Sequence, residues 1–139
     1  MMPRTILVAA AAVALAVAAP AGLASATPPE GSTNRTELAI LPVGPSSVVL
    51  QRLQLQPGAS SGWHVHNGPE YSVISSGSVA VQFAGKCEFT DYGFGQIVFI
   101  PSNAPHRVVN RSSRIAEAFV SYTVPEDAPV RGDAPSPCP

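Results

Sequence analysis

The stretch GASSGWHVHNGPEYSVISSG, residues 58–77, carries two histidines and one glutamate at short spacing. On a β-strand, residues two apart point to the same side, so His64 and His66 should project next to each other. The Asn-Gly-Pro turn at residues 67–69 then reverses the chain, and Glu70 opens the returning strand. Such a hairpin would bring the Glu70 carboxylate beside the two imidazoles, and this combination of donors is typical of a transition-metal site.

A second stretch, GQIVFIPSNAPHRVVN at residues 95–110, holds His106, the last of the three histidines in the chain. A lone histidine on a strand is usually an ordinary polar residue, but here every histidine falls in the pattern. The sequence therefore predicts a metal site formed by His64, His66, Glu70 and His106. Three neutral imidazoles and one carboxylate suit Mn, Fe, Co, Ni, Cu or Zn, and they leave two of six octahedral positions open.

Around these stretches the hydrophobic pattern has a period of two rather than 3.6. In residues 49–56, for example, Leu53 and Leu55 fall on one side of the expected strand, and Arg52 and Gln54 on the other. Similar runs occupy residues 37–43, 63–66, 70–74, 79–83, 96–100, 106–110 and 115–120, with turn residues between them. Together with fifteen prolines and eleven glycines, about eight short strands and no helix predict an all-β sandwich or barrel.

The two stretches resemble the paired motifs of the cupin superfamily. The first reads Gly58-x5-His64-x-His66-x3-Glu70-x6-Gly77, and the second reads Gly95-x5-Pro101-x-Asn103-x2-His106-x3-Asn110. Asn103 stands where the family usually has glycine, and asparagine is the next most tolerant residue for a positive φ. The resemblance implies a small single-domain cupin: a double-stranded β-helix, or jelly-roll barrel, that holds the metal inside through His64, His66, Glu70 and His106.

The resemblance also implies a function at that metal, the binding or conversion of a small organic molecule. As an enzyme, the protein would be a metal-dependent oxidoreductase, dioxygenase-like, with Glu70 as the one candidate base. The alternative is a non-catalytic metal- or ligand-binding protein of the cell envelope, and the fold alone does not separate the two. Relatives often dimerise by pairing or exchanging edge strands, so a homodimer is a further expectation.

The first 26 residues are typical of a secretory signal peptide. Arg4 precedes an apolar run of 14 residues at positions 6–19, and Ala24-Ser25-Ala26 forms a small-x-small cleavage site. The run is shorter than the roughly 20 residues that span a bilayer, so no membrane anchor is expected after cleavage behind Ala26. The protein would then be secreted or placed in the cell envelope and meet its metal there. Intrinsic affinities and metal supply in that location rank Zn, Cu and Mn above Fe or Ni.

The sequence predicts three parts in the mature chain: a flexible leader at 27–35, the barrel at 36–124, and a Pro-rich tail without secondary structure at 125–139. Cys87 and Cys138 are the two cysteines, and in an exported chain they most simply form one disulfide that ties the tail to the barrel. Two free thiols or intermolecular pairing are the alternatives.

Charge excludes some functions. Eight Lys and Arg against nine Asp and Glu give a net charge of −1, which offers no electrostatic basis for binding nucleic acid. No Lys or Arg is predicted to share a face with the histidines, and Arg107 should point away from them, which disfavours a strongly anionic ligand. Arg-Gly-Asp at 131–133 and the sequons at Asn34 and Asn110 are interpreted as chance matches.

Overall fold

The computed structural model describes residues 26–139, so the signal peptide expected at 1–26 lies, apart from Ala26, outside the described residues. Within the described range the chain forms strands and no helix. The strands are β1 (Thr33–Val43), β2 (Ser46–Leu55), β3 (His64–Val65), β4 (Glu70–Ser76), β5 (Ser78–Phe83), β6 (Phe89–Gly93), β7 (Ile97–Ile100), β8 (His106–Val109), β9 (Ala116–Pro125) and β10 (Gly132–Asp133). Of these, β6 and β10 were not expected from the sequence.

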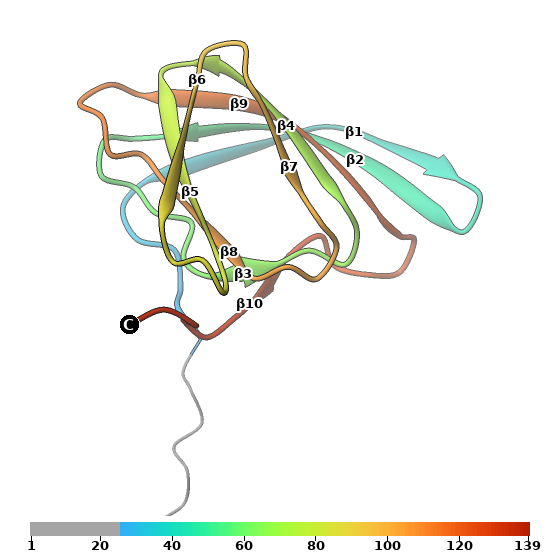
Figure 1. Ribbon diagram of the computed structural model, residues 1–139. Helices are drawn as coiled ribbons and strands as arrows, with labels where there is room; N and C mark the ends of the chain where they lie inside the picture. Colours follow the sequence, from blue (N-terminus) through green and yellow to red (C-terminus); the bar gives the residue numbers. More distant parts are fainter. Residues whose placement is uncertain (1–25) are drawn as a thin grey trace, which may run out of the picture.

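The strands form two five-stranded sheets in the orders β1-β2-β9-β4-β7 and β10-β3-β8-β5-β6, and all pairings are antiparallel. Figure 1 shows the two sheets facing each other, with the β1–β2 hairpin projecting beyond the barrel. The core lies between them and includes Val49, Ile74, Val81, Ile100 and Val120. The predicted all-β fold, a double-stranded β-helix, is confirmed. Among the described residues, none belongs to a helix long and apolar enough to cross a membrane.

Two turns position the metal-site stretches. The backbone at Gly68 approaches β9 so closely that a Cβ there would collide with the carbonyl oxygen of Thr123. Only glycine therefore allows the chain to reverse between His66 and Glu70 without moving β9. Asn103 has a φ of 58°, so the expected left-handed turn before His106 forms with asparagine in place of glycine.

The two terminal segments differ from the expectation. In the leader, β1 already begins at Thr33. The Glu30 and Ser60 backbones exchange two hydrogen bonds, since each N–H donates to the carbonyl of the other residue. In the tail, β10 pairs with β3, and the Thr27 N–H donates to the Ala134 carbonyl at 3.1 Å. The prediction of a tail without secondary structure is therefore wrong at β10. The physical reason is that β3 has an open edge whose backbone groups need partners, and the tail supplies them.

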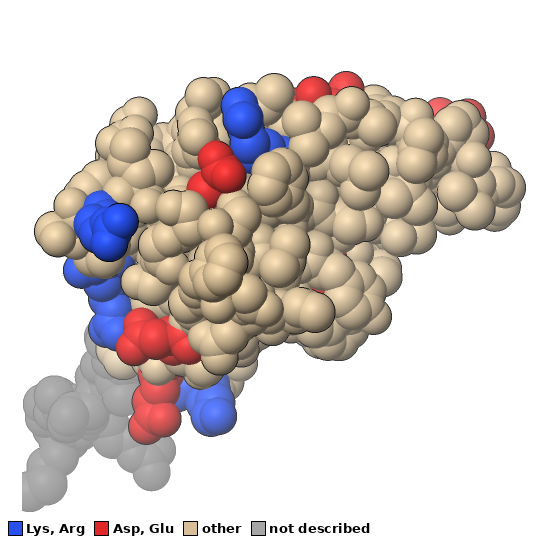
Figure 2. Space-filling view, turned by 90° about the horizontal axis from the view of Figure 1, so that it is seen from above, with Lys and Arg blue, Asp and Glu red and all other residues tan. Residues whose placement is uncertain are grey.

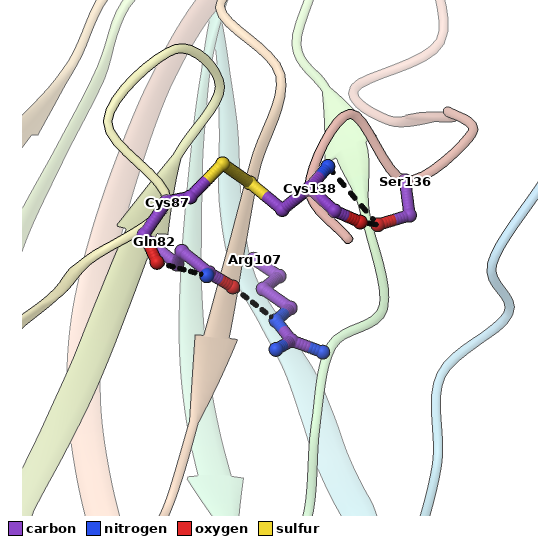
Figure 3. Close-up of a disulfide and its surroundings, with 5 residues drawn as sticks. All are labelled: Gln82, Cys87, Arg107, Ser136 and Cys138. Atoms are coloured by element: carbon purple, nitrogen blue, oxygen red, sulfur yellow. Dashed lines mark hydrogen bonds between the residues drawn. A yellow bond between two sulfur atoms is a disulfide. The ribbon is translucent and has the colours of Figure 1, made fainter.

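The sulfurs of Cys87 and Cys138 lie 2.00 Å apart, at disulfide distance, and join the tail to the β5–β6 loop (Figure 3). The same figure shows Gln82 donating to the Cys87 carbonyl at 2.6 Å and accepting a hydrogen bond from Arg107 at 2.6 Å. The tail is thus held to the barrel through β10 and again at the cysteine pair. We call residues 129–138 the C-terminal strap.

Candidate metal centre

The three histidines converge from two neighbouring strands of the second sheet. His64 begins β3 and lies directly opposite His106, which begins β8, while His66 immediately follows β3. The ring centroids of His64 and His106 are 4.1 Å apart, and that of His66 lies 4.8 and 5.1 Å from them. One ring nitrogen from each histidine lies within 4.8 Å of the other two, so the buried trio could hold a metal ion.

Backbone carbonyls fix the tautomer of all three rings. Each Nδ1 lies at hydrogen-bond distance from a carbonyl oxygen: Gly62 for His64 at 2.9 Å, Val130 for His66 at 2.7 Å, and Ala104 for His106 at 2.9 Å. A carbonyl only accepts, so each Nδ1 carries a proton, and in a neutral imidazole the lone pair is then on Nε2. The Nε2 atoms of His66 and His106 are buried without a hydrogen-bond partner in the described part of the chain. Buried nitrogen lone pairs without a hydrogen-bond partner are suited to bind a metal ion.

Glu70 reaches the trio from the opposite sheet. Its Oε2 lies 2.8 Å from His66 Nε2 and 3.9 Å from His106 Nε2, and its Oε1 accepts a hydrogen bond from Ser72 at 2.6 Å. Two atoms that both carry lone pairs require a proton or a cation between them at 2.8 Å. The structure thus brings together all four residues that the sequence singled out, and their donors fit a divalent transition metal.

The protonation states suit such an ion. Burial, with the nearby charges of His106 and Arg131, lowers the pKa of His64 to about 2. Burial likewise lowers the pKa of His106 to about 4. Burial alone would raise the pKa of Glu70, but its interaction with the nearby His66 and the hydrogen bond from Ser72 outweigh that effect, so the pKa falls below the ordinary value. At neutral pH the neutral His64 and His106 and the ionised Glu70 are in the states that bind metal.

A cavity of about 220 Å³ opens between the sheets beside Glu70. Aliphatic side chains line most of it, while Ser61, Ser72, Arg35 and Arg131 add polar groups. Two arginines therefore line the cavity, although the sequence placed no Lys or Arg on the face of the histidines. Arg131 reaches it because the C-terminal strap folds against β3, a long-range pairing that no local pattern predicts.

The Arg-Gly-Asp tripeptide is explained by the same arrangement. The Arg131 guanidinium donates to the Asp133 carboxylate at 2.7 Å and to the Ser61 carbonyl at 2.7 Å. Its charged groups are therefore engaged with each other and with the barrel, which agrees with a chance match to the adhesion sequence. The Asn110 side chain of the second sequon is buried and donates to the carbonyls of Leu55 and Arg114, which agrees with a chance match there as well.

Tyr122 is a further site residue that the sequence reasoning missed. It lies opposite Glu70 in the β4–β9 pairing, and its ring centroid is 4.7 Å from that of His66. Burial and the Glu70 charge raise the pKa of the Tyr122 phenol, so it stays protonated. A signal existed in the sequence: every second residue of β9 from Ala116 to Val124 faces the core, and Tyr122 shares that alternation.

The outward direction expected for Arg107 is confirmed, since its guanidinium lies over the Phe89 ring at 5.2 Å.

Comparisons with known proteins agree with this fold. The family model described as "Cupin domain" matches residues 51–122, more than half of the 139-residue chain. A variant of oxalate decarboxylase from B. subtilis is similar over 78% of this chain and 30% of its own, with 21% identity and a TM-score of 0.64. The polyketide cyclase RemF from Streptomyces resistomycificus is similar over 75% of this chain and 72% of its own, with 25% identity and a TM-score of 0.62.

A third structure is an uncharacterised conserved protein with a double-stranded β-helix domain from Klebsiella pneumoniae. It is similar over 76% of this chain and 87% of its own, with 21% identity and a TM-score of 0.58. No curated protein sequence matches the chain. The family match spans both histidine-bearing stretches and the strands between them, and on that ground the chain belongs to the cupin family.

Proposed function

We propose that this cupin holds one divalent transition metal ion through the Nε2 atoms of His64, His66 and His106 and through Oε2 of Glu70. The observation that carries the proposal is the tautomer arrangement, in which three backbone carbonyls bind the Nδ1 protons and leave the Nε2 lone pairs facing inward. The close approach of Glu70 Oε2 to His66 Nε2 at 2.8 Å adds support, because a cation between them removes the lone-pair repulsion.

The metal would serve a small organic molecule bound in the adjoining cavity, and the activity we propose is that of a metal-dependent oxidoreductase, dioxygenase-like. When bound, the ion supplies Lewis acidity and, for a redox metal, electron transfer. The chain's own residues bind and orient the ligand. Glu70 is the candidate base, and the aliphatic walls exclude water.

The competing function is a non-catalytic metal- or ligand-binding protein. A shallow or filled site would favour that alternative, whereas a cavity of about 220 Å³ beside Glu70 favours chemistry on a small molecule. Two of the similar structures carry enzyme names, a decarboxylase and a cyclase, which supports the same choice.

We propose further that the protein is exported, with cleavage after Ala26. Its basic start, short apolar run and small-residue site support this. The cysteine pair at disulfide distance is also expected in an oxidising compartment. Cleavage there would keep Thr27, whose hydroxyl accepts a hydrogen bond from the Trp63 N–H at 2.7 Å. Export favours Zn, Cu or Mn over Fe or Ni as the resident ion.

Elemental analysis tests the proposal directly. Protein purified from the secreted fraction without chelator or His tag is expected to contain about one transition-metal ion per chain, because the four donors form one buried site. The same sample dialysed against EDTA serves as control. A redox metal leads to oxygen-uptake assays, and zinc leads to hydrolase and isomerase screens. Metal far below one per chain, not restored by adding Zn, Cu or Mn to dialysed protein, would contradict the proposal.

We also propose that the protein is a homodimer that pairs through β1. This edge strand exposes Leu38, Ile40, Leu41 and Val43, and the neighbouring outer sheet face exposes Tyr71, Val73, Ile97, Phe99 and Phe119. Figure 2 shows a broad surface on this side of the molecule with few charged atoms. An apolar, hydrogen-bonding edge of this kind is typically covered, and antiparallel pairing of β1 with a second copy around a twofold axis would cover it.

Sedimentation equilibrium is expected to give twice the mass of one chain for the wild type at micromolar concentration. Ile40→Lys, on the exposed face of β1, should give the mass of one chain, because it places a charge in the proposed interface. Phe94→Lys is the matched control, since Phe94 is 79% exposed in the β6–β7 turn, away from β1. A wild type with the mass of one chain would show that the exposed edge stays unpaired.

A further inference from the structure

Arg131, from the C-terminal strap, leaves one side of its guanidinium unused inside the cavity. Its Nε donates to Asp133 Oδ1 at 3.0 Å, and its Nη2 donates to the same oxygen and to the Ser61 carbonyl. Its Nη1 is buried and has no hydrogen-bond partner in the described part of the chain. Buried donors without partners are rare, so this nitrogen is best explained by an acceptor supplied by a ligand.

The surroundings identify the charge of that acceptor. The charged residues that line the cavity are Glu70, Arg35 and Arg131. The two cations outnumber the one carboxylate, so the lining carries a net positive charge whether or not Glu70 is bound to a metal ion. Thr33 lines the same cavity, and its hydroxyl is likewise buried without a partner within residues 26–139. A carboxylate suits both groups, since it accepts hydrogen bonds from a guanidinium and from a hydroxyl.

The rest of the cavity limits the ligand to one charge and a small body. Arg35, the other cation, already donates to Gln51 Oε1 at 3.1 Å. Leu53, Ile74, Val98, Ile100 and Val120 line the rest and offer no group that could solvate a second carboxylate. The volume of about 220 Å³ admits only a small molecule. A dicarboxylate or a sugar would leave polar groups unpaired against these aliphatic walls.

We propose that the cavity binds a small monocarboxylic acid with an apolar body, and that Arg131 is the residue that binds its carboxylate. The proposal deepens the proposed function, on which it rests for the cavity being the ligand site. It does not require the metal, because Arg131 and Thr33 belong to the protein itself. It also gives the C-terminal strap a role, which is to carry the carboxylate-binding arginine to the barrel.

Isothermal titration calorimetry of benzoate and of its neutral analogue benzamide tests the proposal, with EDTA-treated and metal-loaded protein in parallel. In both forms benzoate should bind the wild type more tightly than benzamide. Arg131→Gln should weaken benzoate binding about tenfold or more, as expected for the loss of a charged hydrogen bond, and leave benzamide unchanged. Arg111→Gln is the matched control, because Arg111 pairs with Asp91 on the surface and does not line the cavity.

A second variant distinguishes the loss of the Arg131 charge from a local disturbance of the strap. Asp133→Asn removes the carboxylate that competes for Arg131, so benzoate should bind a few times more tightly. Equal binding of benzoate and benzamide, no benzoate binding by the wild type, or an Arg131→Gln variant that binds benzoate normally would overturn the proposal. Arg131-dependent benzoate binding by a protein that takes up no metal would instead overturn the metal site and leave this inference standing.

Discussion

Replacing both His64 and His66 with alanine is expected to lower the affinity for zinc by more than about 1000-fold. Loss of a single group that only supports a ligand typically costs 10–100-fold, so the loss of two direct ligands should exceed that range. His106 and Glu70 would remain, but two donors do not form a closed site. Competition with a chromophoric chelator at neutral pH measures the affinity, and thermal unfolding of the metal-free proteins checks that the variant still folds.

A second variant separates the loss of ligands from damage to the barrel. Glu70→Gln keeps the size of the side chain, and its amide can donate to His66 Nε2 while its oxygen accepts from Ser72. The metal-free variant should therefore unfold at a temperature close to that of the wild type, yet bind zinc about 100-fold more weakly. Glu117→Gln, on the outer face of the same sheet, is the matched control. Zinc affinity unchanged in Glu70→Gln would remove Glu70 from the ligand set.

The four candidate metal ligands could be picked out from the sequence because three of them lie close together in the chain and the fourth, His106, is the remaining histidine. His64, His66 and Glu70 are separated by one turn, and a period of two puts the two histidines on the same side of the chain. The hairpin expected there does not form, because the turn carries the chain from β3 in one sheet to β4 in the facing sheet, and Glu70 meets the histidines from across the barrel. The all-β fold followed from the same periodicity. Even Asn103, the one departure from the family motif, behaved as its tolerance of positive φ predicted.

The place of Arg131 in the lining of the cavity could not be found in this way. Arg131 reaches it through the pairing of β10 with β3, in which Gly132 lies opposite Val65. A two-residue strand has no hydrophobic period, and proline-rich composition favoured a tail without structure. The same limit applies to the Val130 carbonyl, which fixes the His66 tautomer although the two residues lie far apart in the sequence. These contacts depend on backbone pairing between residues far apart in the sequence, and the local hydrophobic pattern does not predict such pairing.

Replacing Cys87 and Cys138 with alanine is expected to lower the free energy of unfolding by about 4 kcal/mol, because the crosslink closes a long loop in the unfolded chain. The two residues are 51 positions apart in the sequence. Urea unfolding of the metal-free wild type and variant, followed by tryptophan fluorescence of the single Trp63, measures the difference. The wild type with reductant should approach the variant, and reductant should leave the variant unchanged.

The same change should reach the metal site through the C-terminal strap. β10 forms only two residue pairs with β3. Without the cysteine link, the strap is held by these pairs and by single hydrogen bonds, such as those from the Ala134 N–H to the Trp63 carbonyl at 2.9 Å and from the Asn67 side chain to the Pro129 carbonyl at 2.8 Å. Release of the strap would remove the Val130 carbonyl from His66 and Arg131 from the cavity. The cysteine-free variant should therefore bind benzoate and zinc more weakly, each by about 10-fold or more. Unchanged stability together with unchanged binding would show that the strap stays docked through its backbone contacts alone.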